Sequence, residues 1–268
     1  MDDEKRAQMT YSTLKFEQRG QIATITLTRP EKRNAISEQV IRELLAALEE
    51  AEECAARIVI LTGSGKAFCA GMDLDGLHAI AGQSLEENMA NSSAMATMFW
   101  RIYQFPKPVI SAVNGAAIAG GCGIATLADF TLAVPEAKFG YSEVRIGFIP
   151  ALVSVFLRRQ IAEKHVNDLL LTGRIVDAAE ALRMGLITEV VAAEKLLERA
   201  HEIAAQLIAA SPTSILRTKR LLHRFSEAEI RAEIELATRD NAEIRATADF
   251  REGVASFLEK RDPKWTGE

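Results

Sequence analysis

The chain has 268 residues, of which 48% are hydrophobic, 6% aromatic and 26% charged, and its formal net charge is −5. A chain this rich in apolar residues can bury a sizeable core, which excludes a disordered or collagen-like protein and favours one large globular domain. The acidic balance gives no broad surface for DNA or RNA, because nucleic-acid binding depends on neutralising phosphates, so we expect no nucleic-acid partner.

The first half of the chain combines strand and helix signals. Residues 1–10 are polar and lack the apolar core of a signal peptide, so we expect a flexible N-terminus there. Apolar residues alternate with threonine at 22–28, which predicts a half-buried strand. Ser37 has the residue type of an N-cap for a helix that runs to about Cys54. A β-branched run at 58–61 predicts the next strand.

The middle of the chain repeats this pattern. The predicted elements are, in order, a helix at 84–104, a buried strand at 109–113, a short helix at 121–128, and alternating strand positions at Phe130, Leu132 and Val134. Short strands that alternate with helices imply parallel pairing and a layered α/β structure. The sequence therefore predicts an α/β core over residues 11–192.

Residues 108–128 carry no charge, and the stretch is long enough to cross a bilayer. It contains one proline, one asparagine and four glycines, and its centre is rich in Gly and Ala instead of Leu. This composition is atypical of a transmembrane helix. We interpret the stretch as a buried strand, a turn and a buried helix, and we expect no membrane partner.

From about residue 193 the pattern contains helices only. They are predicted at 193–210, after the cap Ser211-Pro212, at 226–239, and in a last helix that ends near Lys260. We therefore expect residues 193–268 to form a helical C-terminal region.

The common chemical motifs are missing from the sequence. Neither Gly63-Ser64-Gly65-Lys66-Ala67-Phe68 nor Gly121-Cys122-Gly123 completes a nucleotide-binding fingerprint. The four histidines are isolated and no G-x-S-x-G elbow occurs, so we expect no metal site and no serine triad. The three cysteines are far apart without a C-x-x-C motif, which favours a reducing, cytoplasmic setting.

Backbone groups are the remaining chemical feature. Ala119-Gly120-Gly121 follows a buried strand and opens a short helix, where free N–H groups can stabilise a developing negative oxygen. On spacing alone, the alternative that these glycines only allow close strand–helix packing is favoured.

A set of motifs in fixed order and spacing gives a more specific indication. They are RPEKRNA at 29–35, LTGSGKAFCAGMDL at 61–74, KPVISAVNG at 107–115, GGCG at 120–123, Ala128-Asp129, KFG at 138–140 with Glu143, LTGR at 171–174, and the closing segment 252–261. On these motifs the chain resembles the enoyl-CoA hydratase/isomerase (crotonase) family over nearly its whole length.

The resemblance implies a crotonase-like spiral of ββα units whose helical C-terminal part forms homotrimers, often paired into hexamers. It also implies an acyl-CoA thioester as substrate, with coenzyme A as part of that substrate and no separate cofactor. In the family, two backbone N–H groups bind the thioester oxygen and stabilise an enolate. By the motif they map to Met72 and Gly120.

The resemblance also implies positions that bind the substrate. Lys32 and Arg33, with Arg29 nearby, are candidates for the CoA phosphates, although such a charge cluster is more often a solvated turn. Ala70 lies in the loop that contacts adenine and pantetheine in the family. The other implied positions are Ala35, Asp73 (for which a structural role is the alternative), Leu74, Gly121, and Phe257 and Lys260, which in relatives reach the CoA of a neighbouring subunit.

Hydratases of the family use two glutamates, and this chain has one of them. Glu143 stands at the second position, whereas Gly123 stands at the first and has no acid–base group. The apolar neighbours of Glu143 predict a raised pKa and a catalytic role, with an exposed loop glutamate as the alternative.

A single carboxylate with an oxyanion hole is typical of Δ3-Δ2 enoyl-CoA isomerases, in which Glu143 would move a proton from C2 to C4. Ala151 replaces the aspartate of dienoyl-CoA isomerases, while residues 142–151 resemble branched-chain hydratases of the methylglutaconyl type. We expect an enzyme that hydrates a 2-enoyl-CoA in fatty-acid or branched-chain acyl-CoA degradation. The isomerase is the alternative, and a non-catalytic acyl-CoA-binding scaffold is a further one.

Overall fold

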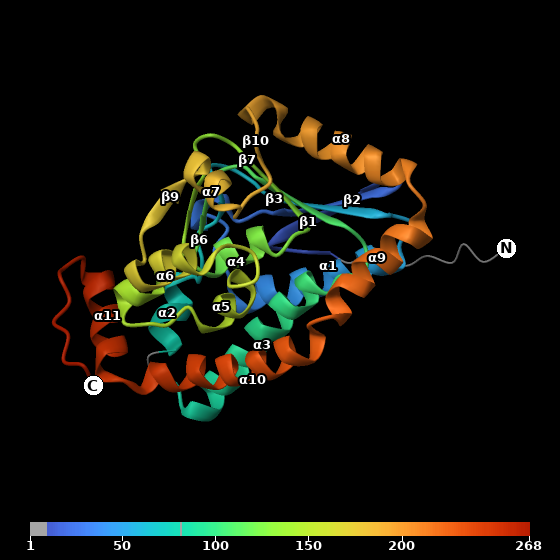
Figure 1. Ribbon diagram of the computed structural model, residues 1–268. Helices are drawn as coiled ribbons and strands as arrows, with labels where there is room; N and C mark the ends of the chain where they lie inside the picture. The colour runs from blue at the N-terminus through green and yellow to red at the C-terminus, as the bar shows by residue number, and fades with distance from the viewer. Residues whose placement is uncertain (1–9, 81) are drawn as a thin grey trace.

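The computed structural model describes residues 10–80 and 82–268, with the backbone alone for Leu74, Asp75 and His78. The expected flexible N-terminus at 1–10 therefore lies outside the described residues, except for Thr10. The strands form two sheets (Figure 1).

The larger sheet has six strands, and every neighbouring pair in it is parallel except the first. Its order is β1 (Leu14–Arg19), β2 (Ile22–Leu27), β3 (Ile58–Gly63), β5 (Val109–Val113), β7 (Phe130–Ala133) and β10 (Glu189–Val190). The smaller sheet has the order β4 (Ala67–Cys69), β6 (Ala116–Ile118), β8 (Lys138–Gly140) and β9 (Ile175–Asp177). This arrangement confirms the predicted α/β class with parallel pairing.

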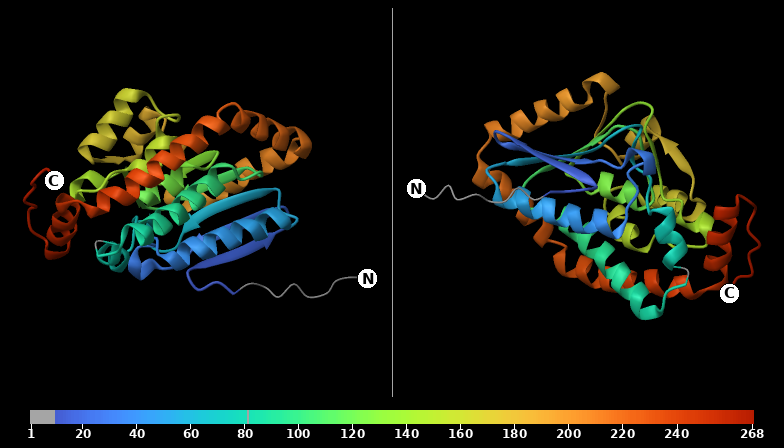
Figure 2. Two further views of the ribbon diagram at one scale, coloured as in Figure 1. Left: turned by 90° about the horizontal axis from the view of Figure 1, so that it is seen from below. Right: turned by 180° about the vertical axis from the view of Figure 1, so that it is seen from behind.

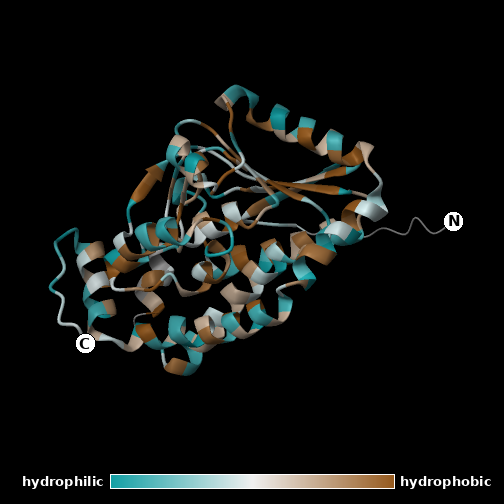
Figure 3. Ribbon diagram, viewed as in Figure 1, coloured by the Kyte–Doolittle hydropathy of each residue, from teal (hydrophilic) through white to brown (hydrophobic). Residues whose placement is uncertain are grey.

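Helices cover both faces of the larger sheet (Figure 1). α8 (Leu196–Ala209) contacts β3, β5 and β7 on one side. α1 (Glu38–Glu53) and α3 (Leu85–Tyr103) lie on the other side, and α10 (Glu227–Glu243) runs along α3, as the view from below in Figure 2 shows. In Figure 3 the strands are mostly hydrophobic, in keeping with a sheet that is covered on both faces.

Shorter helices and 3₁₀ turns complete the fold. The helices are α2 (Leu74–Ile80), α4 (Gly120–Thr126), α5 (Ala151–Leu157), α6 (Glu163–Thr172), α7 (Ala178–Met184), α9 (Pro212–Arg224) and α11 (Ala248–Glu259). The 3₁₀ turns are η1 (Pro30–Lys32), η2 (Glu143–Ile146), η3 (Ala193–Lys195) and η4 (Ile244–Ala246).

Several predicted elements are confirmed with their caps. The hydroxyl of Ser37 accepts a hydrogen bond from the N–H of Val40 at the start of α1, and Ser211 caps α9 in the same way. The uncharged residues 108–128 contain β5, β6 and α4, which confirms a buried strand and helix. In the described part of the chain, no helix is both long and apolar enough to cross a membrane.

The predicted alternation at residues 130–134 was wrong. Thr131 and Ala133 are buried together with Leu132, because β7 lies inside the larger sheet between β5 and β10. A central parallel strand is covered on both faces, so its sequence need not alternate.

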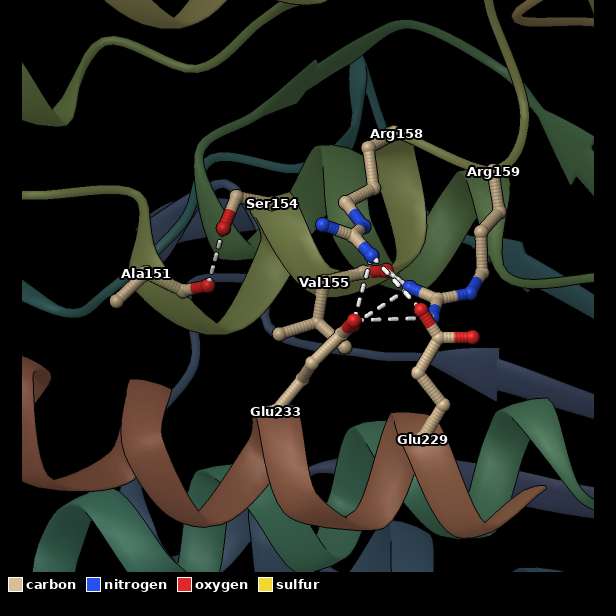
Figure 4. Close-up of polar contacts among 7 residues, drawn as sticks. All are labelled: Ala151, Ser154, Val155, Arg158, Arg159, Glu229 and Glu233. Atoms are coloured by element: carbon tan, nitrogen blue, oxygen red, sulfur yellow. Dashed lines mark hydrogen bonds and ion pairs between the residues drawn. The ribbon is translucent and has the colours of Figure 1, made fainter. Parts of the chain in front are cut away.

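Ion pairs join α10 to the end of α5 (Figure 4). Glu233 accepts hydrogen bonds from Arg158 at 2.5 Å and from Arg159 at 2.6 Å, and Glu229 accepts another from Arg158 at 3.2 Å. These side chains are partly exposed, so each pair contributes on the order of 1 kcal/mol or less to stability. The network links α10 to α5, and α10 carries a residue of the site described next.

Candidate active site

A cavity of about 480 Å³ lies where η1, α4, η2, α5, η4 and α11 meet. Much of its wall is apolar and comes from Met95, Phe99, Ile118, Phe148 and Leu152. Basic side chains, Lys32 and Arg33, are exposed on its η1 side. The cavity therefore combines an apolar interior with a cationic rim, as a ligand with an acyl part and an anionic part requires.

Glu143 is the buried acid of this cavity. It begins η2, is 7% exposed, and accepts a hydrogen bond at its own carbonyl oxygen from the N–H of Phe148. Burial raises the pKa of the Glu143 carboxyl to about 7. Its Oε2 atom is buried without a hydrogen-bond partner in the described part of the chain. Such a carboxyl is poised to exchange a proton with a bound ligand near neutral pH.

Packing against α11 fixes the turn that carries Glu143. A Cβ at Gly253 of α11 would lie 2.2 Å from the carbonyl oxygen of Ile146 in η2. Only glycine allows this approach, which explains the glycine of the closing motif 252–261 in structural terms. The helix is thereby a support for Glu143.

The backbone around Met72 leaves the N–H group of this residue out of the pairing with Ile36. The N–H of Ile36 donates to Gly71 at 2.7 Å, and the N–H of Asp73 donates to Ile36 at 2.9 Å. Since N–H groups alternate in direction along an extended segment, the N–H of Met72 points away from Ile36. Met72 lines the cavity.

Gly120 offers a second backbone group. It is the first residue of α4, so its N–H has no acceptor within the helix. The preceding residue, Ala119, has φ = 51° and donates its own N–H to Gly140 at 2.7 Å. Gly120 lines the same cavity as Met72 and Glu143, so the structure brings the three predicted catalytic positions together.

Four of the predicted substrate-binding positions lie together in the lining of the cavity. They are Lys32, Arg33, Ala35 and Ala70. Phe257 of α11 also lines it and is 51% exposed, whereas Lys260 caps the end of α11 outside the lining. The side chain of Leu74 lies outside the described residues.

Arg29, Asp73 and Gly121 have structural contacts. Arg29 donates to the carbonyl oxygen of Ala35 at 2.9 Å and pairs with Asp73 at 2.8 Å, and Asp73 lines the cavity while Arg29 does not. A Cβ at Gly121 would lie 2.2 Å from the carbonyl oxygen of Cys69, so this glycine allows close packing. The ion pair holds the rim segments together.

Gly123 is closely packed by neighbouring side chains. A Cβ there would lie 2.8 Å from Cγ1 of Val153 and 3.3 Å from the ring of Phe99. The other carboxylates among the described lining residues are Glu31, which is exposed, and Asp73, which is paired with Arg29. Glu143 is therefore the acid best placed for proton transfer.

Sequence reasoning missed two polar residues of the cavity, Asn241 at the end of α10 and Arg245 of η4. Both are buried. No motif marks them, because they reach the cavity only through the packing of α10 on α3 and α5. Across the described ranges, no three His, Cys, Asp or Glu side chains are grouped so that they could hold a metal ion.

Comparison with known proteins places the chain in a family. The family model described as "Enoyl-CoA hydratase/isomerase" matches residues 17–268. The chain belongs to the enoyl-CoA hydratase/isomerase family. The expectations of an enzyme of this family and of a crotonase-like α/β fold are therefore confirmed.

Individual relatives agree with this membership. A Thermus thermophilus protein named "Putative enoyl-CoA hydratase" is 42% identical over 92% of this chain and 98% of its own. A carnitinyl-CoA dehydratase of Citrobacter koseri is 34% identical over 95% of this chain and 98% of its own. The crystal structure of an enoyl-CoA hydratase/isomerase from Xanthobacter autotrophicus Py2 has a TM-score of 0.87 at 29% identity, covering 94% of this chain and 98% of that one.

Proposed function

We propose that this protein hydrates a 2-enoyl-CoA thioester with Glu143 as its single acid–base group. The observation that carries the proposal is the buried Glu143 carboxyl, with a pKa raised to about 7, in the cavity that Met72 and Gly120 also line. Similarity to the protein named as a hydratase in Thermus thermophilus supports hydration as the favoured reaction.

The proposed reaction has two proton transfers. The N–H groups of Met72 and Gly120 bind the thioester oxygen and stabilise the enolate that forms. The Glu143 carboxylate takes a proton from water while the water oxygen bonds to C3 and the C2–C3 π electrons pass into the enolate. The carboxylic acid then returns that proton to C2 and the carboxylate is regenerated. Glu143 thus acts first as the base that deprotonates water and then as the acid that protonates C2.

The CoA part of the substrate is proposed to lie along the rim. Lys32 and Arg33 supply positive charge for its phosphates, and Ala35 and Ala70 contact the adenine and pantetheine. Arg29 and Asp73 hold the segments around them through their ion pair. Phe257 contributes apolar surface, and Lys260 supplies charge to the site of a neighbouring subunit.

The second candidate is Δ3-Δ2 enoyl-CoA isomerisation, which the close packing at Gly123 favours. In that reaction Glu143 takes a proton from C2 and returns it to C4, so one carboxyl is sufficient. A non-catalytic acyl-CoA-binding scaffold is a third candidate. It does not explain why the buried carboxyl of Glu143 has an oxygen atom without a hydrogen-bond partner among the described residues.

One assay separates these candidates. The purified protein is incubated with crotonyl-CoA and with 3-hexenoyl-CoA, and the conjugated enoyl thioester is followed by its absorbance. Loss from crotonyl-CoA supports the hydratase, gain from 3-hexenoyl-CoA alone supports the isomerase, and binding of both without turnover supports the scaffold. Glu143→Gln is expected to lower either rate about 10²–10⁴-fold. The exposed Glu38→Gln is the control, and equal rates for Glu143→Gln and wild type would refute the role of Glu143.

We further propose that residues 193–268 assemble the protein into homotrimers, or hexamers built from two trimers. Large apolar side chains are exposed on α9, the turn after it and α10, namely Leu216, Leu221, Leu222, Phe225 and Leu236. Such a surface is typical of a subunit interface. Light scattering should give three or six times the 29.4 kDa chain mass, and Phe225→Glu should lower it.

The setting that we propose is a reducing cytoplasm, in fatty-acid or branched-chain acyl-CoA degradation. Cys69 and Cys122 are free and buried, and burial raises the pKa of each thiol to about 12. Free thiols of this kind favour a reducing compartment. Localisation of a tagged chain by fractionation tests this directly.

A further inference from the structure

Arg245 brings a buried positive charge to the wall of the cavity. It lies in η4, is 2% exposed, and is one of the lining residues. Its Nη1 donates to Asn88 at 3.1 Å and to Asn91 at 3.0 Å, and its Nη2 donates to Asn241 at 2.8 Å. All three acceptors are amide oxygens, so the contacts orient the guanidinium without neutralising it.

No carboxylate of the described residues pairs with this guanidinium. Its Nε is buried without a hydrogen-bond partner in the same part of the chain. A guanidinium has five N–H groups, and three of them are used by the asparagines. Although burial lowers the pKa of Arg245 to about 10, the group stays charged at neutral pH. An unpaired buried charge is costly, which calls for an anion that arrives from outside the chain.

Phe148 links Arg245 to the turn that carries Glu143. Its Cζ lies 5.5 Å from the ring centroid of Phe148, and the N–H of Phe148 donates to the carbonyl oxygen of Glu143 at 3.0 Å. Asn241 also lines the cavity. Lys32 and Arg33, by contrast, are exposed on the rim, where they suit the phosphates of CoA. The buried charge is therefore available to a small anionic group inside the cavity.

We propose that Arg245, held by Asn241, recognises a carboxylate on the acyl group, so that the preferred substrates are carboxy-substituted 2-enoyl-CoA thioesters. This inference rests on the proposed function and names its substrate class. A carboxylate supplies the missing counter-charge and accepts hydrogen bonds from the free N–H groups of Arg245. Hydrogen bonds between two charged groups are stronger than those between neutral groups. A hydrocarbon chain in the same place would leave the guanidinium both unpaired and shielded from water.

Substrate preference of the unchanged protein is the first test. Glutaconyl-CoA carries a terminal carboxylate, and 5-methylhex-2-enoyl-CoA replaces that carboxylate with an isopropyl group of similar shape. We expect kcat/KM to be at least about 100-fold higher for glutaconyl-CoA, because loss of one buried polar partner strongly disfavours the analogue. A higher value for 5-methylhex-2-enoyl-CoA would overturn the inference and leave the proposed function standing.

Variants of Arg245 distinguish recognition of the substrate carboxylate from a purely structural role. In Arg245→Met the preference ratio should fall at least about 100-fold, Arg245→Lys should retain part of it, and Arg183→Met, at an exposed site on α7, should leave it unchanged. If Arg245→Met stays folded and its kcat/KM falls by the same factor for both substrates, Arg245 only connects α3 to η4 and the inference is wrong.

Binding separates the inference from the proposed function. Calorimetry with the saturated pair, glutaryl-CoA and 5-methylhexanoyl-CoA, measures recognition without chemistry. Tighter binding of glutaryl-CoA than of 5-methylhexanoyl-CoA supports the carboxylate site, whether or not the protein is catalytically active. If the protein turned over neither crotonyl-CoA nor glutaconyl-CoA, that result would refute the proposed function and leave the carboxylate site standing. Equal or weaker binding of glutaryl-CoA would overturn the inference.

Discussion

The space beside Gly123 is occupied by Val153, whose Cγ1 would lie 2.8 Å from a Cβ at position 123. Real Cβ atoms do not approach other heavy atoms that closely, so the backbone of α4 and the side chains of α5 are fitted to a residue without a side chain. Position 123, where the resemblance implies the first glutamate of a hydratase, is therefore packed for a glycine. Val153 and Phe99, which line the cavity, pack against this glycine, and in the proposed reaction one carboxyl carries the proton.

Gly123→Glu should destabilise the protein without accelerating hydration. Overpacking against Val153 is expected to lower the free energy of unfolding by about 1–3 kcal/mol, and the buried carboxyl adds to that cost. Urea unfolding measures the change, and the kcat for crotonyl-CoA measures activity. Gly82→Glu is the matched control, since a Cβ there would meet only the carbonyl oxygen of Ala79, at an ordinary contact distance of 3.8 Å. A stable Gly123→Glu enzyme with faster hydration would contradict this view of the cavity wall.

The activity should depend on pH through Glu143. In the proposed reaction the carboxylate is the form that accepts the first proton, and burial raises the pKa of this group to about 7. We expect kcat/KM to fall about tenfold for each pH unit below about 7. In Glu143→Gln the residual rate should lose this dependence. A wild-type profile that is level down to pH 5 would show that another group carries the proton.

Glu143 should also lower stability at high pH. Its pKa in the folded protein, about 7, lies above the ordinary value of 4.5, so folding favours the protonated form. The resulting stability is full below about pH 4.5 and is lost as the pH rises through about 7. Glu143→Gln should therefore be more stable than wild type by about 2–3 kcal/mol at pH 8, and the difference should shrink towards pH 5. Thermal unfolding at the two pH values measures this, and the exposed Glu38→Gln should show no such trend.

The sequence predicted those parts of the fold whose signals are local. α1 was predictable because Ser37 caps it and apolar residues such as Leu44 recur at helical spacing. The strands β4, β6 and β8 have three residues each, too few for a period, and they form by pairing with one another. Their existence depends on tertiary structure that no local pattern contains.

The residues of the candidate site also fall into those that the sequence located and those that only the structure revealed. Met72, Gly120 and Glu143 lie in motifs, so the resemblance located them before the structure brought them to one cavity. Arg245 and Asn241 belong to the helical C-terminal region, where a single arginine or asparagine has no distinguishing pattern. They become site residues only because α10 runs along α3 and α5 and ends at the cavity.

Glu43 should be the main source of acid sensitivity near the first strand. Burial disfavours its charged form, yet five donor groups of Gln39, Ser12 and Thr13 make six hydrogen bonds to the carboxylate. Hydrogen bonds from these residues lower the pKa of Glu43 to about 2. Because the folded pKa lies below the ordinary 4.5, this stability is present above about pH 4.5 and is lost as the pH falls towards 2.

Replacement of Glu43 by glutamine should therefore cost about 3 kcal/mol of unfolding free energy at pH 7 and much less at pH 2.5. Urea denaturation at both pH values gives the difference directly. Glu38→Gln, on the exposed first turn of the same helix, is the matched control and should change stability by no more than about 0.5 kcal/mol. An equal loss at both pH values would mean that the glutamine disturbs packing, and that the charge of Glu43 does not hold residues 12–13 against α1.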